Sequence, residues 1–167
     1  MLHSANYDFN ETPLENKIFR HNIFVRGKLR IGVVGVGIEL KGLVPEALYA
    51  NTKYNDPVNA LNREAQVLKQ KFNCDFVICL SHLGYEYQTN KISDVKLAAA
   101  TENVDIIIGG HTHTFLNQPR VVSNLHGAPV TIVQAGWGGL LLGRLDVRFN
   151  KTTKRKRVNY MTDKVAK

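Results

Sequence analysis

Cysteine is scarce in this chain, and long apolar runs are absent. The only cysteines are Cys74 and Cys79, and there is no run of about 18 apolar residues that could cross a membrane. Within one extended strand the two thiols would point to opposite faces, and their spacing matches no thiolate metal motif. We therefore predict two free, mostly buried thiols and no membrane partner. The amino-terminal stretch MLHSANYDFNETP also lacks the basic start and the apolar core of a signal peptide.

The composition is that of an ordinary globular domain. Hydrophobic residues make up 44% and charged residues 22% of the 167 positions, which suits a single domain with a sizeable core. The net charge of +8 raises the question of nucleic-acid binding, but five of the basic residues cluster between two strand-like segments: Lys151, Lys154, Arg155, Lys156 and Arg157. No aromatic residues interleave with them, so we predict a solvated hairpin turn and no nucleic-acid partner.

Alternating strand-like and helix-like segments predict an α/β layered fold. Residues 17–25 and 29–36 have the pattern of a hairpin, and Asp56 and Pro57 have the pattern of a helix start that leads to a helix ending near residue 72. A second helix is expected over residues 95–102, and further strands over residues 75–82, 104–110, 129–136, 140–149 and 156–162. Such folds carry functional groups at the carboxyl ends of their strands.

Histidines follow two of these predicted strands directly. His82 closes one apolar run, and Gly110-His111-Thr112-His113 closes the next. Neutral imidazole is the commonest protein ligand for zinc and similar ions, and residues two apart in an extended segment project to the same side. The glycines allow a sharp turn and leave room for an ion and an anionic substrate. We therefore predict that His82, His111 and His113 form a metal site.

The alternative for the same residues is structural. His82 could be a core histidine that donates to a backbone carbonyl, and His111 and His113 could be polar loop residues. The combination of a His-x-His pair with a preceding Gly-Gly strand end favours metal binding over this alternative.

Taken together, these segments resemble the calcineurin-like metallophosphoesterases, in the form typical of the 5'-nucleotidase and UDP-sugar hydrolase branch. The stretches CLSHLGY and DIIIGGHTHT are similar to the last two metal motifs of that family. The stretches LHSANYDF, LRIGVVGV and VTIVQAGWGGLLLGRLDVRF resemble the same branch in order and spacing. The resemblance runs over nearly the whole chain.

The resemblance implies that the chain is part of a four-layer α/β/β/α sandwich with a centre of two divalent ions, such as zinc or manganese. Carried over by position, His82 and His111 would bind one ion and His113 the other. A hydroxide that bridges the ions would attack the phosphorus of a nucleotide or another phosphate ester in line. Because many relatives work outside the cytoplasm, the resemblance also implies a periplasmic or extracellular location for the parent protein.

Three motifs of the family have no counterpart here. No Asp has a His two positions later, and neither Gly-Asp nor Asn-His occurs anywhere in the chain. In the family these segments supply the bridging aspartate, a metal-binding asparagine and the histidine that assists the leaving group. We therefore expect residues 1–167 to be a single domain that is the C-terminal portion of a catalytic domain. Such a chain would hold no complete catalytic machinery and would show little phosphatase activity alone.

Two other interpretations stay open. Gly35-x-Gly37 follows a strand as a dinucleotide-binding turn would, but Leu40 replaces the third glycine and Pro45 disrupts the helix that should follow. The second alternative is a truncated, non-catalytic module that binds a metal or a partner. Sheet surface left uncovered by a missing half-sandwich would also favour self-association.

We expect structural roles for the other aromatic and titratable residues that stand out. Trp137 and Tyr85 are interpreted as packing residues, and His126 as part of a turn. Asp105 is expected to cap or orient a strand end. His21 has no constellation of functional residues around it.

Overall fold

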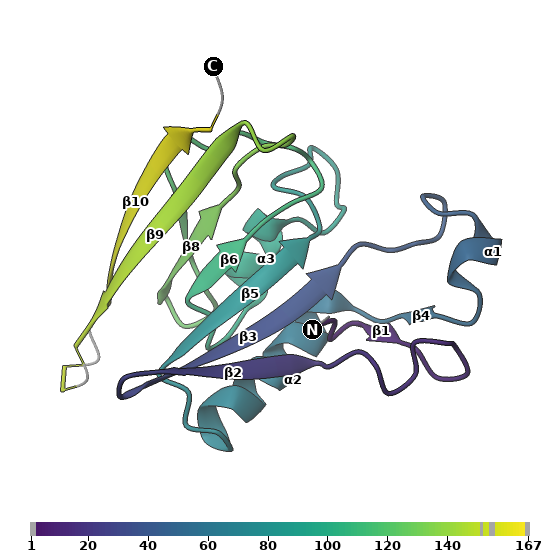
Figure 1. Ribbon diagram of the computed structural model, residues 1–167, viewed down its shortest axis with the longest axis horizontal. Coiled ribbons are helices and arrows are strands. Elements are labelled where there is room, and N and C mark those ends of the chain that lie inside the picture. Colours follow the sequence, from purple (N-terminus) through teal and green to yellow (C-terminus); the bar gives the residue numbers. More distant parts are fainter. Residues whose placement is uncertain (1–2, 151, 154–155, 166–167) are drawn as a thin grey trace.

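The computed structural model describes residues 3–150, 152–153 and 156–165, and a six-stranded sheet forms its centre (Figure 1). The strand order across the sheet is β2-β3-β5-β6-β8-β7. The four inner strands run parallel, and β2 and β7 pair antiparallel at the two edges. The bounds are His21–Arg26 for β2, Leu29–Gly37 for β3, Phe76–His82 for β5, Ile106–Ile108 for β6, Arg120–Ser123 for β7 and Pro129–Val133 for β8.

Two helices cover one face of this sheet, and their starts follow the predicted capping pattern. Helix α2 spans Pro57–Gln70, and the Asp56 side chain accepts a hydrogen bond from the backbone N–H of Asn59 at 2.7 Å. Helix α3 spans Asp94–Ala100, and Ser93 caps it in the same way. Side-chain caps satisfy backbone donors that the first helical turn leaves free, so the predicted helix starts are confirmed.

The core lies between these helices and the sheet. Its members are fully buried apolar side chains from both layers, among them Leu61, Leu68, Leu97, Val34, Val77, Ile107 and Ile132. Cys74 and Cys79 are buried free thiols, as predicted. Tyr85 packs against the same cluster, which confirms its packing role. The α/β class predicted from the sequence is therefore built on one continuous helix-to-sheet core.

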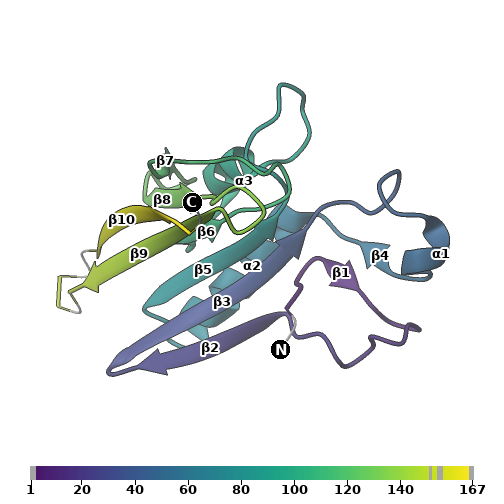
Figure 2. The same cartoon turned by 45° about the horizontal axis from the view of Figure 1, so that its top comes forward.

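Several short elements escaped the sequence prediction. β1 (Tyr7–Asp8) pairs with β4 (Lys53–Tyr54), and together with α1 (Glu46–Tyr49) they lie to one side of the sheet (Figure 2). The buried Asn6 amide joins this lobe to β3, because it both donates to and accepts from the backbone of Gly37 at 2.8 Å. Elements of two to four residues are too short to show a periodic pattern. For the same reason the four-residue edge strand β7 was missed.

The last two strands form a sheet of their own. β9 (Leu141–Phe149) and β10 (Lys156–Lys164) pair antiparallel along their whole length, as the predicted hairpin requires. Three of the residues expected in the solvated basic turn lie outside the described residues: Lys151, Lys154 and Arg155.

Lys156 departs from the prediction of a purely solvated basic run. Its ammonium group forms an ion pair with the carboxylate of Asp105 and lies over the ring of Phe76, 5.4 Å from the ring centroid. Asp105 also accepts a hydrogen bond from the backbone N–H of Val77 at 2.7 Å, so it orients the start of β5 as expected. These contacts fasten the β9–β10 hairpin to the amino-terminal side of the central sheet.

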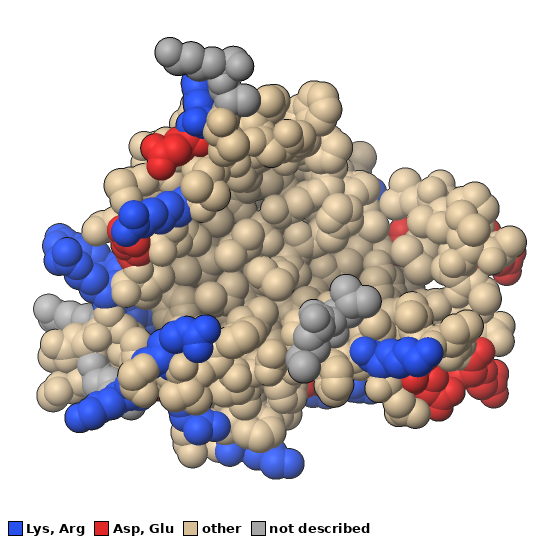
Figure 3. Space-filling view, in the orientation of Figure 1, with Lys and Arg blue, Asp and Glu red and all other residues tan. Residues whose placement is uncertain are grey.

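No described helix covers the second face of the central sheet. Large apolar side chains on this open face keep substantial exposure, including Phe24 at 40%, Leu80 at 42% and Ile108 at 38%. Figure 3 views the molecule from this side, and its hollowed centre holds few charged side chains, while lysine and arginine gather toward the left and lower borders. None of the helices in the described ranges is long and apolar enough to cross a membrane.

Candidate metal centre

The parallel pairing of β5 and β6 brings two of the predicted ligands to one sheet edge. His82 ends β5, and the loop that begins after Ile108 carries His111. Leu80 is the register partner of Ile108, so both strands end at nearly the same level. The imidazole rings of His82 and His111 lie edge to face, with their centroids 5.2 Å apart. The structure therefore places these two predicted ligands side by side.

His113 takes a different position. Its ring stacks on the indole of Trp137, with the ring centroids 6.1 Å apart and the planes tilted by 20°. Trp137 is 58% exposed, so the expectation that it packs into the fold is wrong, because its ring lies at the surface against His113. Within the described residues, no three or more His, Cys, Asp or Glu side chains form a group that could hold a metal. The third imidazole does not join the other two in this arrangement.

The loop between the strands is held in an unusual backbone conformation. His111 has a φ of 72° and His113 has a φ of 55°. Both values lie in the left-handed region, which residues other than glycine rarely adopt. Each such residue costs on the order of 1–3 kcal/mol and persists only where the surrounding structure enforces the conformation. Residues held in this way cluster at binding and catalytic sites, so the strain falls on the two histidines that the sequence singled out.

No family model matches the chain, but individual proteins do. The chain is 30% identical over 167 residues to an apyrase from Aedes aegypti, a match that covers 88% of this chain and 28% of the relative. It superposes on a 5'-nucleotidase precursor from Thermus thermophilus with a TM-score of 0.77 and 27% identity, over 95% of this chain and 33% of that chain. It also matches the calcineurin-like phosphoesterase YfkN from Bacillus subtilis, with a TM-score of 0.67 and 19% identity, over 97% of this chain and 55% of that chain.

The relatives that match this chain are 5'-nucleotidases, apyrases and a nucleotide phosphoesterase, and the structures that it superposes on include calcineurin-like phosphoesterases, so the chain is similar to the calcineurin-like metallophosphoesterases of the 5'-nucleotidase branch. It spans between 11% and 28% of the length of the curated relatives that it matches. Enzymes of this family are hydrolases that generally depend on metal ions. The described residues contribute one helical layer and one central sheet to the four layers that the resemblance implies, together with the β9–β10 hairpin.

The described residues bring together two imidazole donors, those of His82 and His111, which make a partial ligand set for one divalent ion. A Cβ atom at Gly110 would come within 3.1 Å of the His82 Nδ1 atom, so glycine keeps that side of the imidazole open. Burial lowers the pKa of His111, and the charges of His82, Lys91 and His113 lower it further. A lowered pKa favours the neutral imidazole, which is the form that binds metal. A second ion would have fewer donors, because His113 lies apart from this pair and stacks on Trp137.

A buried glutamine that the sequence analysis missed contacts the histidine loop. Gln134 follows β8, is 2% exposed, and forms hydrogen bonds to Gly110, Thr112 and Thr114. The signal was present in the sequence, since a polar side chain that ends the apolar run PVTIV must find partners if it is buried. Local patterns could not name those partners, because they lie at least 20 positions away.

Asp94 is a second buried polar group behind the histidines. Its Oδ1 atom accepts a hydrogen bond from the Ser81 hydroxyl at 2.5 Å, whereas its Oδ2 atom is buried without a hydrogen-bond partner. Burial raises the pKa of Asp94 to about 7, against the opposing effect of the Ser81 hydrogen bond. A Cβ atom at Gly109 would clash with Oδ2, so only glycine fits at that position.

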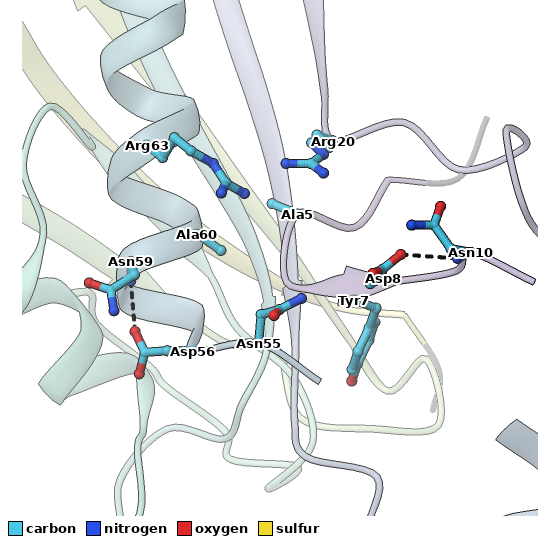
Figure 4. A pocket seen from close by; sticks show the side chains of 10 residues that line it. All are labelled: Ala5, Tyr7, Asp8, Asn10, Arg20, Asn55, Asp56, Asn59, Ala60 and Arg63. Atoms are coloured by element: carbon cyan, nitrogen blue, oxygen red, sulfur yellow. Dashed lines mark hydrogen bonds between the residues drawn. The ribbon is translucent and has the colours of Figure 1, made fainter. Parts of the chain in front are cut away.

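The isolation predicted for His21 is wrong. Its Nδ1 atom lies 2.7 Å from a carboxylate oxygen of Glu64, a residue of α2 that is buried. Arg20 and Arg63 approach the other oxygen of Glu64 at 3.8 and 3.5 Å. Both arginines also line a cavity of about 440 Å³ beside the start of α2, which Figure 4 shows. Glu64 is thus shared by several basic groups, and this cluster is built from residues other than the three histidines.

His126 lies in a turn, as expected. Its backbone N–H donates to the side chain of Asn124 at 2.9 Å, which closes the bend between β7 and β8. Its Nε2 atom lies 3.5 Å from the carboxylate of Glu102 at the surface.

Proposed function

We propose that this chain contributes half of the metal centre of a phosphohydrolase that acts on nucleotides or related phosphate esters. The observation that carries the proposal is the close pair of His82 and His111 at the carboxyl edge of two parallel strands. Names of relatives such as apyrase and 5'-nucleotidase support a nucleotide as the substrate. The name of the Thermus thermophilus neighbour, a precursor, supports a location outside the cytoplasm for the parent protein.

The proposed role of each histidine follows from its position. His82 and His111 would hold one divalent ion, since their rings already lie edge to face with their centroids 5.2 Å apart. His113 would serve a second ion only after its ring leaves Trp137. A divalent ion bound there would lower the pKa of a water molecule and neutralise phosphate charge. Gly110 leaves the approach to the His82 ring free of a side chain.

We further propose that residues 1–167 are a single domain corresponding to the C-terminal portion of a metallophosphoesterase catalytic domain. The small share of each relative that the chain covers supports this assignment. The Asp-x-His, Gly-Asp and Asn-His segments that would complete a two-ion centre do not occur in the sequence. We therefore expect the purified chain to bind metal and to hydrolyse AMP no faster than a metal-only blank. Robust metal-dependent turnover of AMP by the pure chain would contradict this expectation.

Metal titration tests the ligand assignment. Calorimetric titration of the chain with Zn²⁺ and with Mn²⁺ should show binding that weakens more than about tenfold in His111→Ala, because one of two imidazole ligands is lost. The loss in His113→Ala should be smaller, since that ring is stacked on Trp137. His126→Ala is the matched control, because His126 is an exposed histidine in a turn. Equal titrations for the wild type and His111→Ala would refute the assignment.

A non-catalytic module that binds a partner is the second candidate function. The open apolar face of the central sheet favours it, because contiguous exposed apolar surface marks association sites. Self-association through this face is therefore part of the proposal, and its test is among the predictions below.

A further inference from the structure

We propose that Gln134 is a positioning residue for the metal centre: it holds the loop 110–114 so that His111 stays beside His82 and His113 stays against Trp137. This inference rests on the proposed function, because it assigns a role within the same site. Gln134 would not touch the ion or the substrate itself.

The contacts of the Gln134 amide alternate with the histidines along the loop. The Nε2 atom donates to the carbonyl oxygen of Gly110 at 2.6 Å. The Oε1 atom accepts from the backbone N–H of Thr114 at 2.5 Å and from the Thr112 hydroxyl at 3.1 Å. One side chain thus bonds to every second residue of the loop. The residues between these anchors are His111 and His113.

This arrangement explains how two histidines keep a left-handed backbone. Both have positive φ values, and neither has the conformational freedom of glycine. Such residues persist only where the surrounding structure enforces them. Because the amide bonds to a residue on each side of both histidines, it supplies the contacts that enforce the conformation.

The backbone after β8 reinforces the same loop. Leu116 donates to the carbonyl oxygen of Gln134 at 3.1 Å, and Gly136 donates to that of Thr114 at 3.0 Å. Trp137, which stacks on His113, follows directly in the chain. The segment from Gln134 to Trp137 is therefore a platform on which the histidine loop rests.

The same hydrogen-bond network reaches the loop that follows His82. The Thr112 hydroxyl, which bonds to Gln134, also accepts from the backbone N–H of Tyr85 at 2.9 Å. Gln134 therefore links the loop of one proposed ligand to the loop of the other. A change at Gln134 should alter the spacing between His82 and His111 without removing either ligand.

The test compares three variants of the full chain by Zn²⁺ titration. Gln134→Met keeps the length of the side chain and removes all three hydrogen bonds. Gln134→Glu keeps an acceptor for Thr114 but loses the donor to Gly110. Thr131→Val is the control, because Thr131 lies in β8, just before Gln134, and outside the loop network. Residues that orient metal ligands change metal affinity by about 10- to 100-fold.

We expect the dissociation constant for Zn²⁺ to rise at least about tenfold in Gln134→Met, less in Gln134→Glu, and less than about twofold in Thr131→Val. The titration temperature is chosen from thermal melts so that each variant is fully folded, which separates positioning from stability. A folded Gln134→Met variant that binds Zn²⁺ as the wild type does would overturn the proposal. If that variant does not fold, the Gln134→Glu titration decides in the same way.

A second measurement separates this proposal from the proposed function. Trp137 is the only tryptophan in the chain, and its stacking on His113 makes its fluorescence a reporter of the loop. His113→Ala gives the emission of the unstacked indole. In the absence of metal, Gln134→Met should move the emission toward that reference. If the wild type binds no Zn²⁺, the proposed function fails, but the emission measurement still tests the positioning role. An unchanged spectrum in Gln134→Met overturns that role.

Discussion

The two faces of the central sheet are built from neighbouring residues of the same strands, yet their environments differ sharply. Val77 and Ile107 point to the helices and are 0% exposed, whereas Leu80 and Ile108 point to the open face and are 42% and 38% exposed. Successive side chains of a strand alternate between faces, so one apolar run supplies both surfaces. The comparison teaches that apolar content does not by itself make a core, because a core also needs a second layer to cover it.

The largest expected effect is a difference in the free energy of unfolding between substitutions on the two faces. Leu68→Ala removes a fully buried side chain of α2 and should lower the free energy of unfolding by about 2–5 kcal/mol. Leu80→Ala removes the same atoms from the open face and should cost about 1 kcal/mol or less. Urea unfolding followed by circular dichroism measures both. Similar losses in the two variants would mean that the open face is covered in solution.

The second effect concerns Asp94, a buried carboxyl group on the helix-covered side of the sheet. The pKa of Asp94 is raised to about 7 by burial, so the folded state holds a proton that the unfolded state loses near pH 4. The contribution to stability is complete below about pH 4 and is lost as the pH rises to about 7, a difference on the order of 4 kcal/mol. As the pH rises from about 4 to about 7, the wild type should therefore lose stability relative to the Asp94→Asn variant.

Melting temperatures of the wild type and Asp94→Asn from pH 4 to pH 8 give this difference directly. Other titrating groups act equally on both proteins and cancel in the comparison. A difference that stays constant across the window would show that Asp94 is ionised in the folded state throughout.

The third prediction concerns self-association through the open face, and it involves the smallest change in stability. Leu80→Lys places a charge in the centre of that face on a chain whose net charge is already +8. The variant should unfold within about 1 kcal/mol of the wild type, because its site is partly exposed. Sedimentation velocity should show larger species for the wild type than for Leu80→Lys as concentration rises. A wild type that sediments as a monomer at all concentrations would rule out self-association through this face.

Much of the fold could be predicted from local patterns. The cap at Asp56 and Pro57, the helical spacing that follows it, and the apolar run ending at His82 all mark real elements. The patterns failed where elements are short or where partners are distant. β1 and β4 each have two residues and exist because they pair with each other across the chain. Lys156 reads as a solvent-exposed charge in sequence, but the fold brings it to Asp105, 51 positions away.

Sequence alone determined the α/β class, the helix starts and the placement of His82 and His111 at strand ends, because each depends on spacing within a few residues. Tertiary structure alone decided that His113 stacks on Trp137, that several basic side chains approach the Glu64 carboxylate, and that Gln134 forms hydrogen bonds to the histidine loop. The physical reason is the same in each case. A buried polar or strained group needs partners, and the chain can supply them from any distance once the sheet has brought its strands together.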